Sequence, residues 1–150
     1  MSHKKKILLT AGGTATTWHF CQVIKKYFDA DLEIYITDTN ESYLTPSSIY
    51  ADKFFQVPPV KAPSYIETMH QLLRDEGIDI IVPLIDFDLF NFAKDDQFLN
   101  ELGVISTAPQ LATSQTLTEK KAMFNFLFSH HIPTPRLYRL SEIKSNQKDV

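Results

Sequence analysis

Short apolar runs alternate with helical patterns along the chain as far as residue 107. Apolar or β-branched runs of strand length occupy residues 6–10, 33–37, 54–57, 79–83 and 104–106. Apolar residues recur every three or four positions in segments 16–28, 65–73 and 89–102. Gly77 and Gly103 follow two of these segments, where a left-handed residue commonly ends a helix. The alternation predicts an α/β fold, a Rossmann-like open parallel sheet of about five strands with helices on both faces.

The pattern changes after Thr107. Two helical patterns, residues 109–113 and 118–130, follow each other without an intervening strand, and Pro133 and Pro135 then interrupt the chain. Residues 136–140 have the pattern of a new strand, and the remaining residues are polar. We therefore expect an α/β domain over residues 1–108, followed over 109–150 by linker helices and the truncated start of a second domain.

Composition narrows the classes of partner. The chain has 43% hydrophobic and 22% charged residues, an ordinary balance for a globular protein. Its formal net charge of −3 gives no reason to expect nucleic acid or an anionic membrane as a partner. The apolar run at residues 7–9 is too short for a signal peptide, and no segment approaches the ~20 apolar residues of a membrane span. We expect a cytoplasmic protein.

Metal binding and thiol chemistry find little support in the sequence. The five histidines do not have the spacing to acids or cysteines that a zinc site requires, so we expect no metal site. Cys21 is the only cysteine, which excludes an intramolecular disulfide within the chain. Its place on the apolar face of a helical segment predicts a buried core side chain rather than a reactive thiol.

The glycine pair after the first predicted strand is a candidate ligand loop. Gly12, Gly13 and Thr14 come before a helical segment, and backbone N–H groups at a helix start favour an anion. The spacing nevertheless fails both the G-x-G-x-x-G dinucleotide pattern and the phosphate-binding P-loop pattern. Two interpretations stay open: a tight strand-to-helix turn, which we favour, or a loop that contacts a ligand. Asp38, at the end of the second strand, is more simply a solvated carboxylate than a ribose-binding acid.

Two aspartates follow the fourth predicted strand. Asp86 and Asp88 are expected at the carboxyl edge of the sheet, where open α/β folds place their ligands. A structural explanation is equally compatible with the pattern, because Asp88 can cap the next helix and Asp86 can occupy a turn. Lys120 lies early in the last helical segment. Its spacing alone indicates only a solvated surface lysine.

Three stretches together resemble the ATP-grasp superfamily, and in particular relatives of the carbamoyl-phosphate synthase large chain. They are TLTEKKAMFNFLFSHHIPTPRLY at residues 116–138, DIIVPLIDFDL at 79–89 and ADKFFQVPP at 51–59. Glu119 and Lys120 correspond to an acidic-Lys pair at a helix start, and His131 precedes the Ile-Pro-x-Pro block. The family usually has Asp in place of Glu119 and Gly in place of His131. The resemblance implies that Lys120 contacts a bound nucleotide.

The resemblance also implies a function for the whole protein. It would be an ATP- and Mg²⁺-dependent ligase that activates a carboxylate as an acyl phosphate, for attack by an amine or a thiol. The present chain would be its pre-ATP-grasp part, inactive alone and without catalytic residues, with the glycine loop and Asp86 and Asp88 on the substrate side. The expected partners are a small carboxylate or amine substrate and a second copy of the chain in a homo-oligomer. The alternative is a stand-alone Rossmann-like module that binds NAD or another nucleotide.

Overall fold

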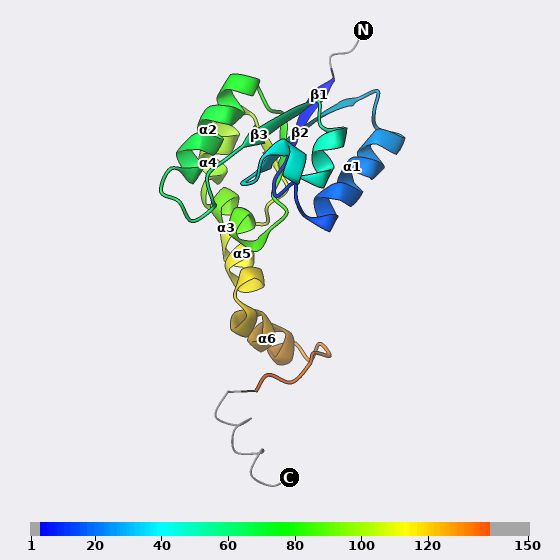
Figure 1. Cartoon of the computed structure of the whole chain (residues 1–150). Helices are drawn as coiled ribbons and strands as arrows, with labels where there is room; N and C mark the ends of the chain where they lie inside the picture. Colours follow the sequence, from blue (N-terminus) through cyan, green and yellow to red (C-terminus); the bar gives the residue numbers. More distant parts are fainter. Residues whose placement is uncertain (1–3, 139–150) are drawn as a thin grey trace. The chain divides into compact units, whose positions relative to one another are not determined.

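Residues 4–138 are described by the computed structural model, and within them five parallel strands form one sheet in the order β3-β2-β1-β4-β5 (Figure 1). The strands are β1 (Lys5–Leu9), β2 (Leu32–Asp38), β3 (Lys53–Gln56), β4 (Ile80–Val82) and β5 (Ile105–Ser106). In the central register, Leu8 pairs with Tyr35 on one side and with Ile81 on the other. The predicted fold class, an open parallel Rossmann-like sheet, is confirmed.

Helices cover both faces of the sheet. On one face lies α1 (Ala15–Tyr27), whose buried Cys21 and Ile24 pack with Ile34 and Ile36 of β2. On the other lie α2 (Tyr65–Glu76), α3 (Asp86–Lys94) and α4 (Asp96–Leu102). Alternate residues of β2 therefore enter different cores, because Tyr35 packs with the α2 side.

Cys21 is fully buried, as predicted. Burial raises the pKa of its thiol from 9.0 to about 11, which disfavours the reactive thiolate. The residue therefore serves as a small apolar core side chain.

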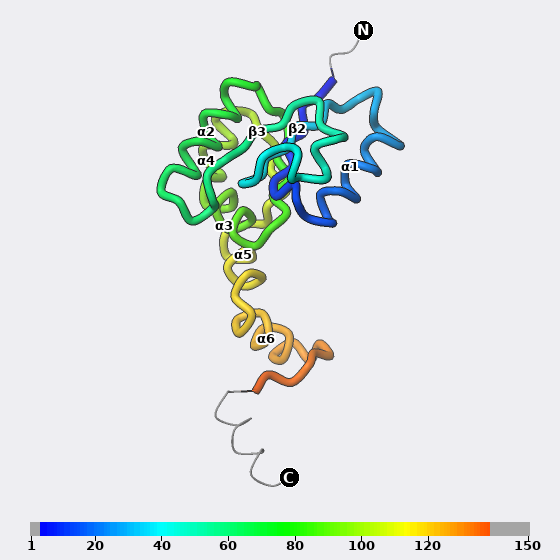
Figure 2. The backbone as a smooth tube through the Cα atoms, in the orientation of Figure 1, coloured from blue at the N-terminus to red at the C-terminus, as the bar shows by residue number. Residues whose placement is uncertain are grey.

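The connection between β2 and β3 contains no α-helix. Two short 3-10 helices, η1 (Ser42–Leu44) and η2 (Pro46–Tyr50), fill it, and the tube in Figure 2 shows this segment returning beside α1. Trp18 of α1 meets Tyr50 of η2 edge to face, with ring centroids 4.9 Å apart. This contact anchors the connection over the α1 face of the sheet.

The prediction of a single helix over residues 89–102 is wrong. Two helices occupy the segment, and it bends at Asp95, where φ is −92° and ψ is 16°. The Asp95 carboxylate contacts Nε2 of His70 on α2 at 3.0 Å. Aspartate favours helix ends over helix interiors because its side chain competes for local hydrogen bonds. Both helices keep a fully buried side chain, Phe92 in α3 and Leu99 in α4.

The chain divides into two compact units, residues 1–114 and 115–150. Helix α5 (Leu111–Thr118) contains this division, and α6 (Lys120–Ser129) lies in the second unit. The domain boundary predicted near residue 108 stays a prediction. Of the strand expected at 136–140, residues 136–138 are irregular, and the rest lies outside the described residues. Over residues 4–138, no helix has the length and apolar character that crossing a bilayer requires.

Candidate functional site

The glycine loop joins β1 to α1 and packs tightly against β2. The left-handed residue of this turn is Ala11, with φ at +53°, and neither glycine has a positive φ. Gly12 is buried, and its N–H donates to the carbonyl of Thr37 at 3.0 Å. A Cβ at residue 12 would lie only 2.5 Å from Cγ2 of Ile36 and 2.8 Å from Cγ2 of Thr45. Gly12 is therefore required by close packing, which supports the tight-turn interpretation.

Side-chain hydrogen bonds fix the rest of this loop. Thr14 caps α1, because its Oγ1 accepts from the N–H of Thr17 at 3.2 Å. The hydroxyl of Thr17 in turn lies 3.0 Å from the carbonyl of Thr10 and 2.7 Å from that of Ala11. The turn is thus held from both ends by threonines.

Asp38 ties the glycine loop to the end of β2. One carboxylate oxygen accepts from the N–H of Gly13 at 2.7 Å, and the other accepts from the backbone and side-chain nitrogens of Asn40 at 2.8 and 3.0 Å. The residue is only 8% exposed. The interpretation of Asp38 as a solvated strand-end carboxylate is therefore wrong. Its two oxygens are already engaged in holding neighbouring loops together.

Asp88 forms the second buried carboxyl at this edge. The residue is only 1% exposed, and its Oδ1 accepts a hydrogen bond of 2.7 Å from the hydroxyl of Tyr65 on α2. Burial raises the pKa of the Asp88 carboxyl, while hydrogen bonds from Tyr65 and Thr10 lower it. Burial, with the charge of Asp88, also raises the pKa of the Tyr65 hydroxyl. The two side chains form one buried polar pair.

The proposed capping role of Asp88 is wrong, because Ile85 occupies the N-cap of α3 and Asp88 lies inside its first turn. Asp86 begins the same helix and is exposed. The two aspartates therefore differ in environment although they are two residues apart in the sequence.

A cavity of about 110 Å³ lies between these groups. Its polar lining comes from Thr37, Asp38, Thr39, Tyr65 and Asp88, and its apolar lining from Ala11, Val57, Val60 and Ile85. The strand order reverses between β1 and β4, so the carboxyl ends of these strands form the crevice where open α/β sheets bind ligands. Gly12, Gly13, Thr14 and Asp88 thus gather around this edge; their contact with a substrate stays a prediction.

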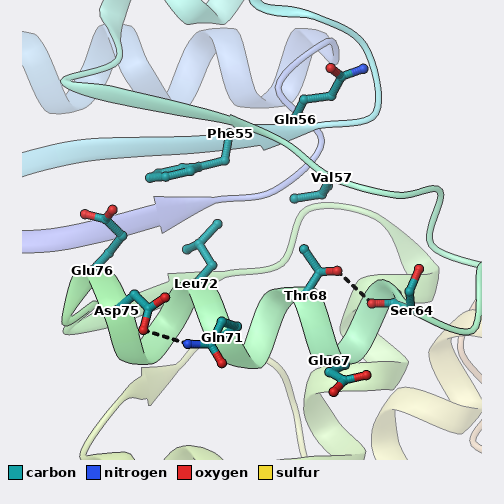
Figure 3. A pocket seen from close by; sticks show the side chains of 10 residues that line it. All are labelled: Phe55, Gln56, Val57, Ser64, Glu67, Thr68, Gln71, Leu72, Asp75 and Glu76. Atoms are coloured by element: carbon teal, nitrogen blue, oxygen red, sulfur yellow. Dashed lines mark hydrogen bonds between the residues drawn. The ribbon is translucent and has the colours of Figure 1, made fainter.

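A larger cavity, of about 480 Å³, lies between the edge strand β3 and α2 (Figure 3). Phe55 and Leu72 form part of its apolar floor, and the carboxylates of Glu67 and Asp75 lie around it. Asp75 already accepts a hydrogen bond of 2.7 Å from the side chain of Gln71. None of the site residues that the sequence predicts lines this cavity. The smaller cavity is therefore the better candidate site.

Lys120 belongs to the second unit, where it is the first residue of α6 and is exposed. Glu119 caps that helix, since its carboxylate accepts from the N–H groups of Lys121 and Ala122 at 3.1 and 2.5 Å. The acidic residue of the acidic-Lys pair thus has a structural role. Within residues 4–138, no three His, Cys, Asp or Glu side chains converge as metal ligands.

Tyr65 and Thr37 were not anticipated as site residues. The sequence places Tyr65 on the apolar face of the predicted helix 65–73. A buried tyrosine usually places its hydroxyl against a polar partner, so this hydroxyl was the one indication of a polar site. Thr37 gave no comparable signal. The cavity that Thr37 lines is also lined by Tyr65 of α2 and Asp88 of α3, and the local pattern of β2 does not reveal these residues.

Comparison with known proteins identifies relatives of this fold. A family model described as PylC-like, N-terminal domain, matches residues 7–107. Solved structures with the same fold include the biotin carboxylase domain dimer of Hydrogenobacter thermophilus 2-oxoglutarate carboxylase, in complex with MgADP, ADP and bicarbonate. It has a TM-score of 0.61 and 19% identity, over 99% of this chain and 33% of that one.

Two further structures have a similar fold. The biotin carboxylase subunit of a pyruvate carboxylase has a TM-score of 0.60 and 17% identity, over 98% of this chain and 33% of that one. The complete pyruvate carboxylase of Rhizobium etli has a TM-score of 0.57 and 19% identity, over 91% of this chain and 13% of that one. The present chain thus spans a third or less of these proteins. No curated protein sequence matches it.

Proposed function

The chain belongs to the family of PylC-like N-terminal domains, and from this premise we propose that it forms the N-terminal part of an ATP-dependent ligase of the ATP-grasp type. In such a ligase, ATP activates a carboxylate as an acyl phosphate, and an amine or thiol then attacks it. The similarity in fold to biotin carboxylase domains, one of them in complex with MgADP and bicarbonate, supports this proposal. The carbamoyl-phosphate reaction is one member of this class of reactions.

The role proposed for this chain is to shape the substrate side, and by itself it catalyses nothing. The observation that carries the proposal is the 110 Å³ cavity at the carboxyl edge, where Asp38 accepts from Gly13 of the glycine loop and Asp88 accepts from Tyr65 of α2. Rigid, hydrogen-bonded side chains of this kind position a substrate without reorganising when it binds. Asp86 and the exposed Gly13 lie at the same edge and complete the proposed substrate side.

ATP is proposed to contact Lys120 of the second unit. A flexible ammonium at the start of α6 is a suitable point-charge partner for phosphate oxygens. Within residues 4–138 no three His, Cys, Asp or Glu side chains converge, so the described residues offer no ready-made cluster of metal ligands. By the family resemblance, we propose that the Mg²⁺ ligands of the ligase, a strand lysine and a glycine-rich lid are supplied by its ATP-grasp domain.

The rival proposal, an NAD-binding regulatory module, is less well supported. A ribose-binding acid at the end of β2 would have to be Asp38, whose carboxylate oxygens already accept from Gly13 and Asn40. The glycine spacing also lacks the residues that bring a pyrophosphate close to the backbone. The site chemistry thus favours the ligase proposal.

Lys120→Ala in the intact ligase tests this proposal, with Lys121→Ala as the matched control on the same helical turn. We expect Lys120→Ala to raise the apparent KM for ATP at least about tenfold, as for loss of one charge-assisted hydrogen bond, and to leave the KM of the acceptor nearly unchanged. Lys121→Ala is expected to change neither constant. Equal effects of the two substitutions on ATP would contradict the assignment of Lys120.

A further inference from the structure

The hydroxyl of Thr37 is buried without a hydrogen-bond partner among the described residues. Thr37 lies near the carboxyl end of β2 and is 1% exposed, and its Oγ1 contacts no donor or acceptor. Strand alternation places its side chain on the face of Tyr35, the face on which Val57 and Tyr65 pack. This is the face on which the 110 Å³ cavity opens, and Thr37 lines it. Buried hydroxyls are nearly always satisfied, so this one indicates a polar ligand.

The charges around the cavity specify the sign of that ligand. Asp38 and Asp88 line it, whereas none of its lining residues is Lys, Arg or His. The hydrogen bonds that Asp88 receives from Tyr65 and Thr10 come from neutral hydroxyls, so neither contact pairs its charge. A buried carboxylate is stabilised by a cation at hydrogen-bond distance. The cavity therefore favours a positively charged group and disfavours a carboxylate.

Size and shape restrict the ligand further. A volume of about 110 Å³ holds a group of a few heavy atoms. Val57, Val60 and Ile85 provide apolar walls, which suit a methylene chain. An ammonium head has three N–H donors, which match the carboxylate of Asp88 and the free hydroxyl oxygen of Thr37.

We propose that the cavity at the carboxyl edge binds the protonated primary amine of a substrate, an alkylammonium group held by Asp88 and Thr37. This inference rests on the proposed function, and it names the class of substrate that this domain presents. Tyr65 acts as a positioning residue, because its hydroxyl donates to Oδ1 of Asp88 and fixes the orientation of the carboxyl group. Asp38 contributes to the negative field of the cavity while it holds the glycine loop.

Titration of the ¹⁵N-labelled chain with propylammonium, followed by two-dimensional NMR, tests the inference. We expect saturable shifts of the amides of Thr37, Ile85 and Asp88 with a millimolar dissociation constant, as is usual for so small a ligand. Propanol, of similar size and neutral, and propionate, of opposite charge, are expected to give no saturable shifts at these amides.

Two substitutions and a matched control connect the binding to the cavity. Thr37→Val keeps the shape of the side chain and removes its hydroxyl, and we expect it to weaken propylammonium binding about fivefold to tenfold. Asp88→Asn is expected to abolish it. Ser47→Ala is the control, because Ser47 has the other buried, unpartnered hydroxyl of the described residues and does not line the cavity. This control should bind as the unsubstituted chain does.

Several outcomes overturn the inference. Absence of saturable shifts with propylammonium, equal binding of propanol, or tighter binding of propionate would each exclude an amine site. So would a Thr37→Val chain that folds and binds with unchanged affinity. These results would leave the ATP dependence of the Lys120→Ala ligase as a separate test, so failure of the amine site is distinguishable from failure of the proposed function.

Discussion

The hydroxyl of Tyr65 on α2 donates a hydrogen bond of 2.7 Å to Oδ1 of Asp88 on α3, and both side chains are almost fully buried. The bond connects the helices that precede and follow β4. It therefore holds together the two crossovers that flank the carboxyl-edge cavity.

Replacing Tyr65 by Phe should destabilise the first unit. The substitution keeps the ring and removes the donor to a buried carboxyl, so we expect the free energy of unfolding at neutral pH to fall by about 1.5–3 kcal/mol. Urea denaturation measures this change. Tyr43→Phe is the control, because Tyr43 is 76% exposed and should change stability little. Equal stabilities of the two variants would contradict a stabilising Tyr65–Asp88 bond.

Asp88 should make stability depend on pH in a defined direction. Burial raises the pKa of its carboxyl above the ordinary value of 3.8, so the folded state binds this proton more tightly than the unfolded state. Asp88 therefore contributes its full stabilisation at pH values below its pKa in the unfolded chain. This stabilisation is lost as the pH rises through the pKa of Asp88 in the folded chain. Asn does not titrate, so the stability of Asp88→Asn relative to the unsubstituted chain should rise as the pH increases from the ordinary carboxyl pKa of 3.8 through the raised pKa of the folded state. A pH-independent difference in urea midpoints would contradict this.

The two adjacent glycines should differ in their tolerance of a methyl group. Gly12→Ala places a Cβ 2.5 Å from a side-chain atom of Ile36, and we expect it to lower the free energy of unfolding by about 1–3 kcal/mol through overpacking. At Gly13 the nearest atom, Oδ2 of Asp38, would be 3.3 Å away, so Gly13→Ala should cost less. Thermal unfolding of both variants provides the comparison. A greater loss for Gly13→Ala would contradict the packing role of Gly12.

Replacing His131 by glycine, the residue usual at this position in the ATP-grasp relatives, should stabilise the end of α6. The φ of His131 is +55°, and the N–H groups of Ile132 and His131 donate to the carbonyls of Leu127 and Phe128, the pattern of a Schellman cap. His131→Gly should stabilise the end of α6 by about 0.5–1 kcal/mol, because a left-handed residue without Cβ is unstrained. Amide hydrogen exchange of α6 measures this, and His130→Gly, one residue earlier with φ at −95°, is the control. Slower exchange in the control variant alone would contradict the prediction.

The general fold could be predicted because its signals are local. Apolar runs identified the strands, and Gly77 and Gly103 ended helices in the left-handed conformation, with φ at +59° and +72°. Asp95 was missed because its bend accompanies a contact with His70, which is distant in sequence. Periodicity alone does not detect such a contact.

The sequence could place the candidate site at the carboxyl edge of the sheet. It could not predict which of the site residues are buried or which hydrogen bonds they make. Asp38 ends one strand and Asp88 comes soon after another, so the two aspartates look alike in sequence. Their burial depends on Gly13 and Tyr65, which are 25 and 23 residues away along the chain. Those contacts follow from the strand order and from the angles at which helices pack on the sheet. For the same reason Thr37 was not recognised as a site residue.

We propose that this domain serves the substrate side of an ATP-grasp ligase and does not bind a dinucleotide. Isothermal titration calorimetry of the chain with NAD⁺ and NADH tests it most directly. We expect no binding at micromolar concentration, because Asp38 is engaged by Gly13 and Asn40 and the glycine spacing does not fit a pyrophosphate. Micromolar NAD⁺ or NADH binding that is lost in Asp38→Ala would contradict it.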